Sequence, residues 1–196
     1  PHQPAVTAQM LERFGDLAGV LCVFGRAIRR VVIHTEQIRR SIEWAPELLL
    51  RGIELGEIDI PDSKQLRSMG LVAFRLHKGC VLFRRDASGF LPLPLDVPSL
   101  WVTAPTREDQ RFGFAVNASF ALDAGRGRLA GDTAQNLELA AALGRELGEH
   151  LVQLQPKIVQ APAQWLGQLG LASSASLAQL WASLWGTLAA RWLGFN

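Results

Sequence analysis

A chain of 196 residues with 48% hydrophobic and 19% charged residues has the composition of a folded globular protein, which excludes the disordered class. Its formal net charge of +2 argues against a dedicated DNA-binding surface. The sequence contains no apolar run of 18 residues and no signal-peptide pattern, so we expect no membrane span and a cytoplasmic location. Because the chain begins with Pro1, we expect it to be a segment of a longer polypeptide or a processed product.

The first part of the chain predicts a helix followed by strands. Apolar residues at helical spacing predict a helix over 7–24 that fades into a strand, and 29–34 reads as the next strand. A turn at Pro46 and a period-two stretch follow within 42–60. The Pro-Asp-Ser sequence at 61–63 is expected to break that strand.

The middle of the chain predicts more strands. Segments 71–77 and 80–85 form a hairpin around a tight Lys-Gly connection. The proline-limited segment 90–94 is expected at a sheet edge, and 100–103 and 113–122 complete the sheet.

From this point the pattern becomes helical. Asp132 or Thr133 can cap a helix that runs to about Gln155. Strands followed by helices indicate the α+β class, with a mixed or antiparallel sheet and packed helices. We therefore divide the chain into an α+β domain over 1–156 and a helical segment over 157–196, which can begin a further domain.

The C-terminal segment is rich in tryptophan. Helical spacing places Trp181, Trp185 and Trp192 on one face together with leucines. Large aromatic side chains on such a face pack against a neighbouring layer or anchor a protein interface. We expect these three residues to form an interface, and their exposure would indicate a missing partner surface.

The segment 112–129, FGFAVNASFALDAGRGRL, is the most informative one. It predicts an alternating strand that runs directly into a Gly-Arg-Gly-Arg turn at 125–128 and then a helix. Glycines permit positive φ and the close approach of a phosphate, and a planar guanidinium suits phosphate oxygens. Such a turn can present a cation and free backbone N–H groups to an anion. The alternative is an ordinary turn with two solvated arginines.

The other polar residues form no self-sufficient catalytic set. No histidine has a ligand partner at metal-binding spacing, so we expect no metal site. Cys22 and Cys80 lie in apolar runs and are expected to be reduced core thiols. The acidic run from Glu54 to Asp62 is expected to be a solvated strand face, and the arginines between Arg26 and Arg40 either contact nucleic acid or form a solvated basic face.

Two segments resemble a known family. The sequence LDAGRGRL at 122–129 resembles LNISREML in the middle domain of the ninety-kilodalton heat-shock chaperone, and it resembles more closely the corresponding region of sacsin-type bacterial ATPases of the GHKL superfamily. The sequence VLCVFGRAIRRV at 20–31 resembles the LLLFLRNLRRI strand that opens this domain. The similarity covers roughly residues 10–150.

The order of motifs is also similar. Those ATPases have a motif like FLPLP and then a motif like PFHVNGxFxLSSDR. A helix with an asparagine near its start follows these two motifs. This chain has FLPLP at 90–94 and FAVNASF at 114–120, followed by Arg126 and Asn136.

The resemblance implies a transducer-like middle domain with the ribosomal-protein-S5-domain-2-like fold, placed after a nucleotide-binding domain. In that family an arginine of this segment reaches the γ-phosphate of ATP in the upstream domain and couples nucleotide state to domain closure. The resemblance assigns this catalytic role to Arg126 and the phosphate contacts to Gly125, Gly127 and Arg128. ATP with Mg would be held mainly by the upstream domain, and this chain alone would not hydrolyse it. The chain departs from the chaperone motif at two positions: Asp123 replaces the Asn of the motif, and Gly125 replaces its Ser. Arg128 is a second cation that competes with Arg126 for the role.

Two other interpretations stay open. Asp123 to Gly127 also matches the Asp-x-Gly-x-Gly adenine motif of the nucleotide-binding domain itself, but the Glu-x-x-x-Asn helix expected upstream is missing from 80–95. Alternatively, the chain is a non-catalytic module that docks a protein partner through its Trp-rich helix. Burial distinguishes these interpretations, because the ATPase interpretation requires an exposed Arg126. A pair with Asp123 or Asp132 deep in the fold would contradict it.

Overall fold

The computed structural model describes residues 4–34, 39–63, 65–87, 89–108, 113–131, 133–154 and 175–192. These residues form an α+β structure with a mixed, largely antiparallel sheet, which confirms the predicted class. The helices are α1 (Pro4–Phe24), α2 (Ala134–Leu154) and α4 (Ala175–Trp192). The strands are β1 (Arg30–His34), β2 (Arg39–Glu43), β3 (Glu47–Leu50), β4 (Ile53–Asp62), β5 (Gln65–Leu76), β6 (Gly79–Asp86), β7 (Gly89–Leu91), β8 (Leu100–Val102), β9 (Ala104–Pro105) and β10 (Ala115–Ala118).

The main sheet has the strand order β3-β4-β5-β6-β10-β8-β9, with β7 paired to β6. Its ladders are antiparallel except for the parallel pair β10–β8. The predicted hairpin is confirmed, since Leu76 pairs with Gly79 across the turn between β5 and β6. Strands β1 and β2 form a separate two-stranded ribbon.

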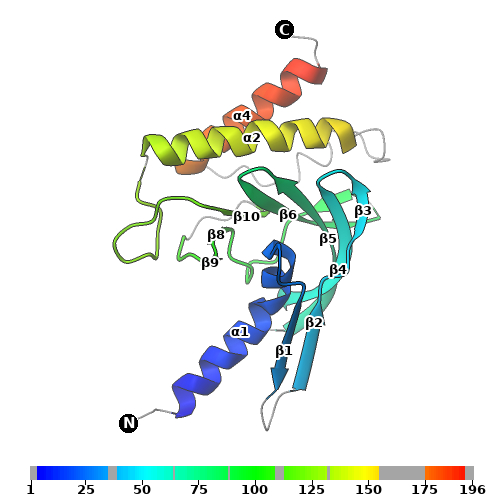
Figure 1. The fold of residues 1–196 in the computed structure, drawn as a ribbon, viewed down its shortest axis with the longest axis vertical. Coiled ribbons are helices and arrows are strands. Elements are labelled where there is room, and N and C mark those ends of the chain that lie inside the picture. The colour runs from blue at the N-terminus through cyan, green and yellow to red at the C-terminus, as the bar shows by residue number, and fades with distance from the viewer. Residues whose placement is uncertain are drawn as a thin grey trace.

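Helices cover both faces of the main sheet. Helix α1 and the β1–β2 ribbon lie on one side, and α2 and α4 lie on the other (Figure 1). The side chains of β5 alternate between the two layers, because neighbouring residues of a strand point to opposite faces. Val72 and Phe74 join the cluster under α2 and α4, whereas Leu71 and Ala73 join the cluster under α1. Both faces of the central strands are therefore buried.

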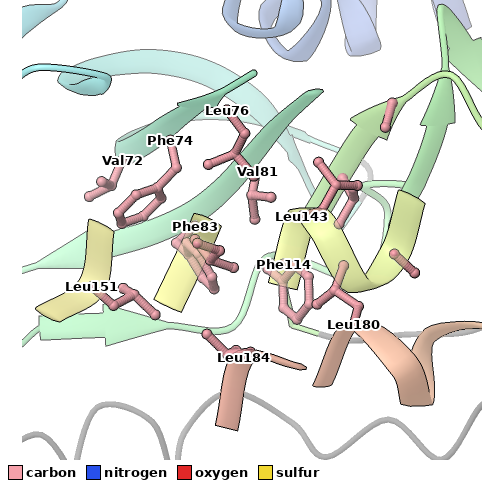
Figure 2. Close-up of a cluster of buried hydrophobic side chains, with 14 of the residues drawn as sticks. Val72, Phe74, Leu76, Val81, Phe83, Phe114, Leu143, Leu151, Leu180 and Leu184 are labelled. Atoms are coloured by element: carbon pink, nitrogen blue, oxygen red, sulfur yellow. The ribbon is translucent and has the colours of Figure 1, made fainter. Parts of the chain in front are cut away.

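Helix α4 contributes to the same core as α2. Leu180 and Leu184 lie with Phe83 and Phe114 of the sheet side in one hydrophobic cluster (Figure 2). The two helices approach closely at Gly144, where an added Cβ would lie 2.2 Å from the Leu180 carbonyl oxygen. The closeness of the two backbones explains why a residue without a side chain stands at this position.

Three predictions about elements need correction. Helix α1 remains helical to Phe24 instead of fading into a strand. Strand β4 continues through Pro61 to Asp62, and Pro61 pairs with Leu66 of β5. Proline is tolerated there because β3 pairs only with the first residues of β4, so the other edge of β4 needs no N–H donor at Pro61. The strand predicted over 113–122 is shorter, since β10 covers only Ala115–Ala118.

The two cysteines are free and buried, as predicted for core thiols. Burial raises the pKa of the Cys80 thiol to about 11, although Arg75 opposes this rise, so the thiol stays protonated at neutral pH. Among the helices that the structure describes, none combines the length and apolar character that a membrane span needs.

Candidate functional site at the arginine turn

The Gly-Arg-Gly-Arg segment at 125–128, called the arginine turn below, lies at the tip of a loop between β10 and α2. The chain leaves the sheet after Ala118, and Leu122 and Leu129 then form an isolated antiparallel bridge. The Asp123 N–H donates to the Arg128 carbonyl oxygen at 2.9 Å and closes the tip. The prediction of a strand that runs directly into the turn is therefore wrong. The loop extends from the end of the sheet, in yellow-green at the left of Figure 1, before the chain enters α2.

Arg126 itself has the left-handed conformation of this turn. Its φ is 51°, while neither Gly125 nor Gly127 is among the glycines with positive φ. The glycines were expected to supply this conformation, but the structure places it on the arginine between them. A non-glycine residue in this region is uncommon and strained. The backbone N–H of Arg126 donates to the Asp123 carbonyl oxygen at 2.9 Å, which holds the turn in place.

The Asp123 carboxylate already binds the amides of the turn. Its Oδ1 accepts hydrogen bonds from Gly127 N at 2.9 Å and from Arg128 N at 3.3 Å. An aspartate side chain commonly stabilises a turn by accepting such backbone hydrogen bonds, and the Asp-x-Gly pattern is the sequence signal for it. Backbone N–H groups arranged in this way can bind an external anion. Here the Gly127 and Arg128 N–H groups bind the Asp123 carboxylate of the same chain instead.

Asn136 attaches the loop to the start of α2. Its side chain is buried; Oδ1 accepts from Ala121 N at 2.8 Å, and Nδ2 donates to the carbonyl oxygens of Ala121 at 3.1 Å and Gly131 at 3.3 Å. The Thr133 hydroxyl accepts from Asn136 N at 3.2 Å, which confirms Thr133 as the N-cap. One amide side chain thus fixes two separate points of the loop.

The segment after β9 holds the other side of the loop. Arg107 N donates to the Gly127 carbonyl oxygen at 2.6 Å, and Leu129 N donates to Glu108 Oε1 at 2.7 Å. No local sequence signal points to these contacts, because about twenty residues separate the partners. Together with Asn136 they anchor the turn from both sides.

The Arg126 side chain is exposed. Its guanidinium forms no hydrogen bond or ion pair with any residue that the structure describes. The buried pair with Asp123 that would contradict the ATPase interpretation is not formed, because Asp123 is exposed and its carboxylate binds backbone amides. Asp132 lies outside the described residues. Arg126 thus provides an accessible cation on an anchored turn.

The predicted tryptophan interface is only partly described. Leu184 and Leu188 of α4 are fully buried, whereas Trp185 is 38% exposed. The buried leucines face the core, and Trp185 contributes to the outer surface of the helix. The side chains of Trp181 and Trp192 lie outside the described residues.

The basic patch between Arg26 and Arg40 is divided among several partners. Arg29 binds Glu54 with both guanidinium ends, at 3.0 and 3.1 Å. Arg30 donates to the Ser41 hydroxyl at 3.0 Å, and Arg40 lies 4.0 Å from Asp16. Most of these arginines have a partner within the fold, so the patch does not form one continuous cationic surface.

Glu54 does not lie on a solvated strand face as predicted. It accepts hydrogen bonds from Arg29, from Arg75 Nη2 at 2.7 Å and from Trp44 Nε1 at 3.0 Å, and 13% of its side chain is exposed. Burial by itself raises the pKa of Glu54, but these hydrogen bonds outweigh it and lower the pKa to about 2. The alternation of the strand could not reveal this site, because its partners come from three other segments.

Within the described part of the chain, no cluster of three or more His, Cys, Asp or Glu side chains is arranged to hold a metal ion. Comparison with protein-family models, with curated proteins and with solved structures finds no match to this chain.

Proposed function

We propose that this chain is the transducer-like domain of a GHKL-type ATPase and that Arg126 acts on ATP held with Mg by an upstream nucleotide-binding domain. The two adjacent helices over one face of a mixed sheet support the ribosomal-protein-S5-domain-2-like fold as part of this proposal. By this proposal the chain does not hydrolyse ATP alone but completes the site of its neighbour.

A single observation carries the proposal. Arg126 is exposed and without an ion pair among the described residues, although the turn beneath it is anchored by Asp123, Asn136 and Glu108. A catalytic cation must be available to its substrate and must also be held in position. An arginine in an ordinary solvated turn would be available to solvent, but it would not need an anchored turn beneath it.

The hydrogen bonds of the turn support a division of roles within this proposal. Because Asp123 holds the Gly127 and Arg128 amides, we assign the phosphate contact to the Arg126 guanidinium rather than to these amides. A guanidinium placed against the γ-phosphate stabilises the negative charge that develops during phosphoryl transfer. Binding of the γ-phosphate would hold the two domains together, and its release would let them separate.

The test is steady-state ATP hydrolysis by the parent polypeptide. Arg126→Ala should lower the rate about ten-fold or more, the order expected when one transition-state cation is removed. Arg128→Ala is the matched control, since Arg128 is exposed on the same turn and should have a much smaller effect. Equal effects of the two substitutions, or no effect of Arg126→Ala, would contradict the assignment.

The second candidate is a non-catalytic interaction module that docks a protein partner. The exposure of Trp185 on the outer surface of α4 favours it. Under this alternative, Trp185→Ser in the parent should weaken its assembly with a partner, measured by sedimentation, and Arg126→Ala should leave that assembly unchanged. Unchanged sedimentation of the Trp185→Ser variant would contradict the module.

A further inference from the structure

A cleft of about 600 Å³ opens at the end of the sheet near the start of α2. Five segments form its walls: the end of α1 with the residues just after it, the β5–β6 turn, the end of β8, the end of β10, and the first turns of α2. The volume lies within the range of small-molecule sites. Such sites combine apolar walls with a few polar groups, and this cleft has residues of both kinds. Phe24, Ala118 and Leu139 contribute apolar surface, whereas Arg26, Lys78 and Asn117 are among its polar lining residues.

Two cations line the same side of the cleft. Arg26 is anchored, since its Nη2 donates to the carbonyl oxygens of Leu76 at 3.1 Å and His77 at 3.4 Å. Lys78 follows at the tip of the hairpin, is exposed, and forms no hydrogen bond or ion pair with the described residues. The carboxylate among the lining residues belongs to Glu138 of α2. Arg26, Lys78 and Glu138 together carry a net charge of +1. A second carboxylate, that of Glu146, lies beside the cleft, since it accepts from His77 N at 2.8 and 2.9 Å.

Neutral hydrogen-bonding groups also line the cleft. Asn117 Oδ1 accepts from Thr103 N at 3.2 Å, which leaves the Asn117 amide nitrogen as a donor. Thr103 has a φ of 66°, a strained conformation for a β-branched residue, and such strain is concentrated at functional sites. The Ser119 hydroxyl also lines the cleft. An anchored arginine, an accessible lysine and these groups match the chemistry of a small oxyanion.

We propose that this cleft binds a small molecule that carries a phosphate or carboxylate group. Arg26 and Lys78 neutralise the anion, and Asn117 and Ser119 donate hydrogen bonds to its oxygens. Glu138 opposes the charge of the anion and accepts from a hydroxyl or amino group of the same ligand. The proposal does not depend on the role of Arg126, because none of these residues belongs to the arginine turn.

The experiment is isothermal titration calorimetry of the whole chain with inorganic phosphate and, separately, with acetate, at pH 7.5 and constant ionic strength. Lys78→Ala and Arg26→Gln should each weaken binding of the preferred anion about five-fold or more, the order expected for one nearby opposite charge. Arg30→Gln is the matched control, since this exposed arginine lies on β1 outside the cleft, and it should leave the affinity unchanged.

One further variant is expected to tighten binding instead of weakening it. A variant that only impaired folding could not produce this result. Glu138→Gln removes the opposing charge from an exposed helix position and should tighten binding about two- to five-fold. Comparison of phosphate with acetate identifies which anion the site prefers. No binding of either anion up to 10 mM (roughly the limit of a useful site), or binding that none of the three cleft substitutions changes, would overturn the proposal.

Discussion

Two arginine-containing regions of this protein differ in what surrounds the guanidinium. In the first, which we call the Glu54 cluster, the Glu54 carboxylate accepts hydrogen bonds from Arg29, Arg75 and Trp44. The two arginines of this cluster share one carboxylate that is largely buried. At the arginine turn, the backbone amides are bound internally by Asp123, and the Arg126 side chain is exposed. A paired arginine contributes to the fold, whereas an accessible one on an anchored turn is available for another molecule. Residue type alone does not distinguish these roles.

The largest expected effect is at the Glu54 cluster. Glu54→Gln should lower the free energy of unfolding by about 3 kcal/mol, because two guanidinium groups would lose the carboxylate that neutralises them. Urea denaturation measures the change. Glu57→Gln on the exposed side of the same strand is the control and should change stability by less than about 0.5 kcal/mol. Equal effects of the two variants would show that the cluster contributes little.

The pH dependence of stability should also report on this cluster. The pKa of Glu54 is lowered in the folded protein from its ordinary value of 4.5 to about 2. Its contribution to stability is therefore complete above about pH 4.5 and is lost as the pH falls toward 2. Urea denaturation between these pH values should show a steep loss of stability, and the Glu54→Gln variant should show a shallower one. Parallel curves for the two proteins would contradict the assigned pKa.

A smaller effect is expected at Asp123. Asp123→Ala removes the acceptor of two backbone N–H groups and should lower stability by about 1 kcal/mol. Faster hydrogen exchange at the Gly127 and Arg128 amides would show that the loss is local. Asp123→Asn keeps an oxygen in place and should preserve most of the protection. Loss of protection in both variants would mean that charge, and not the acceptor geometry, holds the turn.

The smallest effect concerns the conformation of the turn. Arg126→Gly should raise the free energy of unfolding by about 0.5–1 kcal/mol, since glycine adopts the observed positive φ without strain. Arg128→Gly is the matched control, because Arg128 is not among the residues with positive φ, and it should be neutral or destabilising. Thermal denaturation of both variants is the measurement. Destabilisation by Arg126→Gly would show that the arginine side chain contributes to the fold.

Local patterns were sufficient for several elements. The hairpin of β5 and β6 follows from two apolar runs joined by a short polar turn, and Thr133 at the start of α2 follows from its capping preference. The continuation of β4 through Pro61 could not be predicted in this way. Whether a strand tolerates proline depends on which of its edges is paired, and the pairing is a tertiary property.

The sequence by itself determined the α+β class, the buried thiols and the presence of an arginine-containing turn before a capped helix. These features depend on the spacing of apolar residues and on preferences of neighbours in the chain. Only the tertiary structure decided that Glu54 is paired, that Asp123 occupies the turn amides and that Arg126 is exposed. Whether a charged side chain is paired or accessible depends on partners far away in the sequence, such as Arg75 for Glu54.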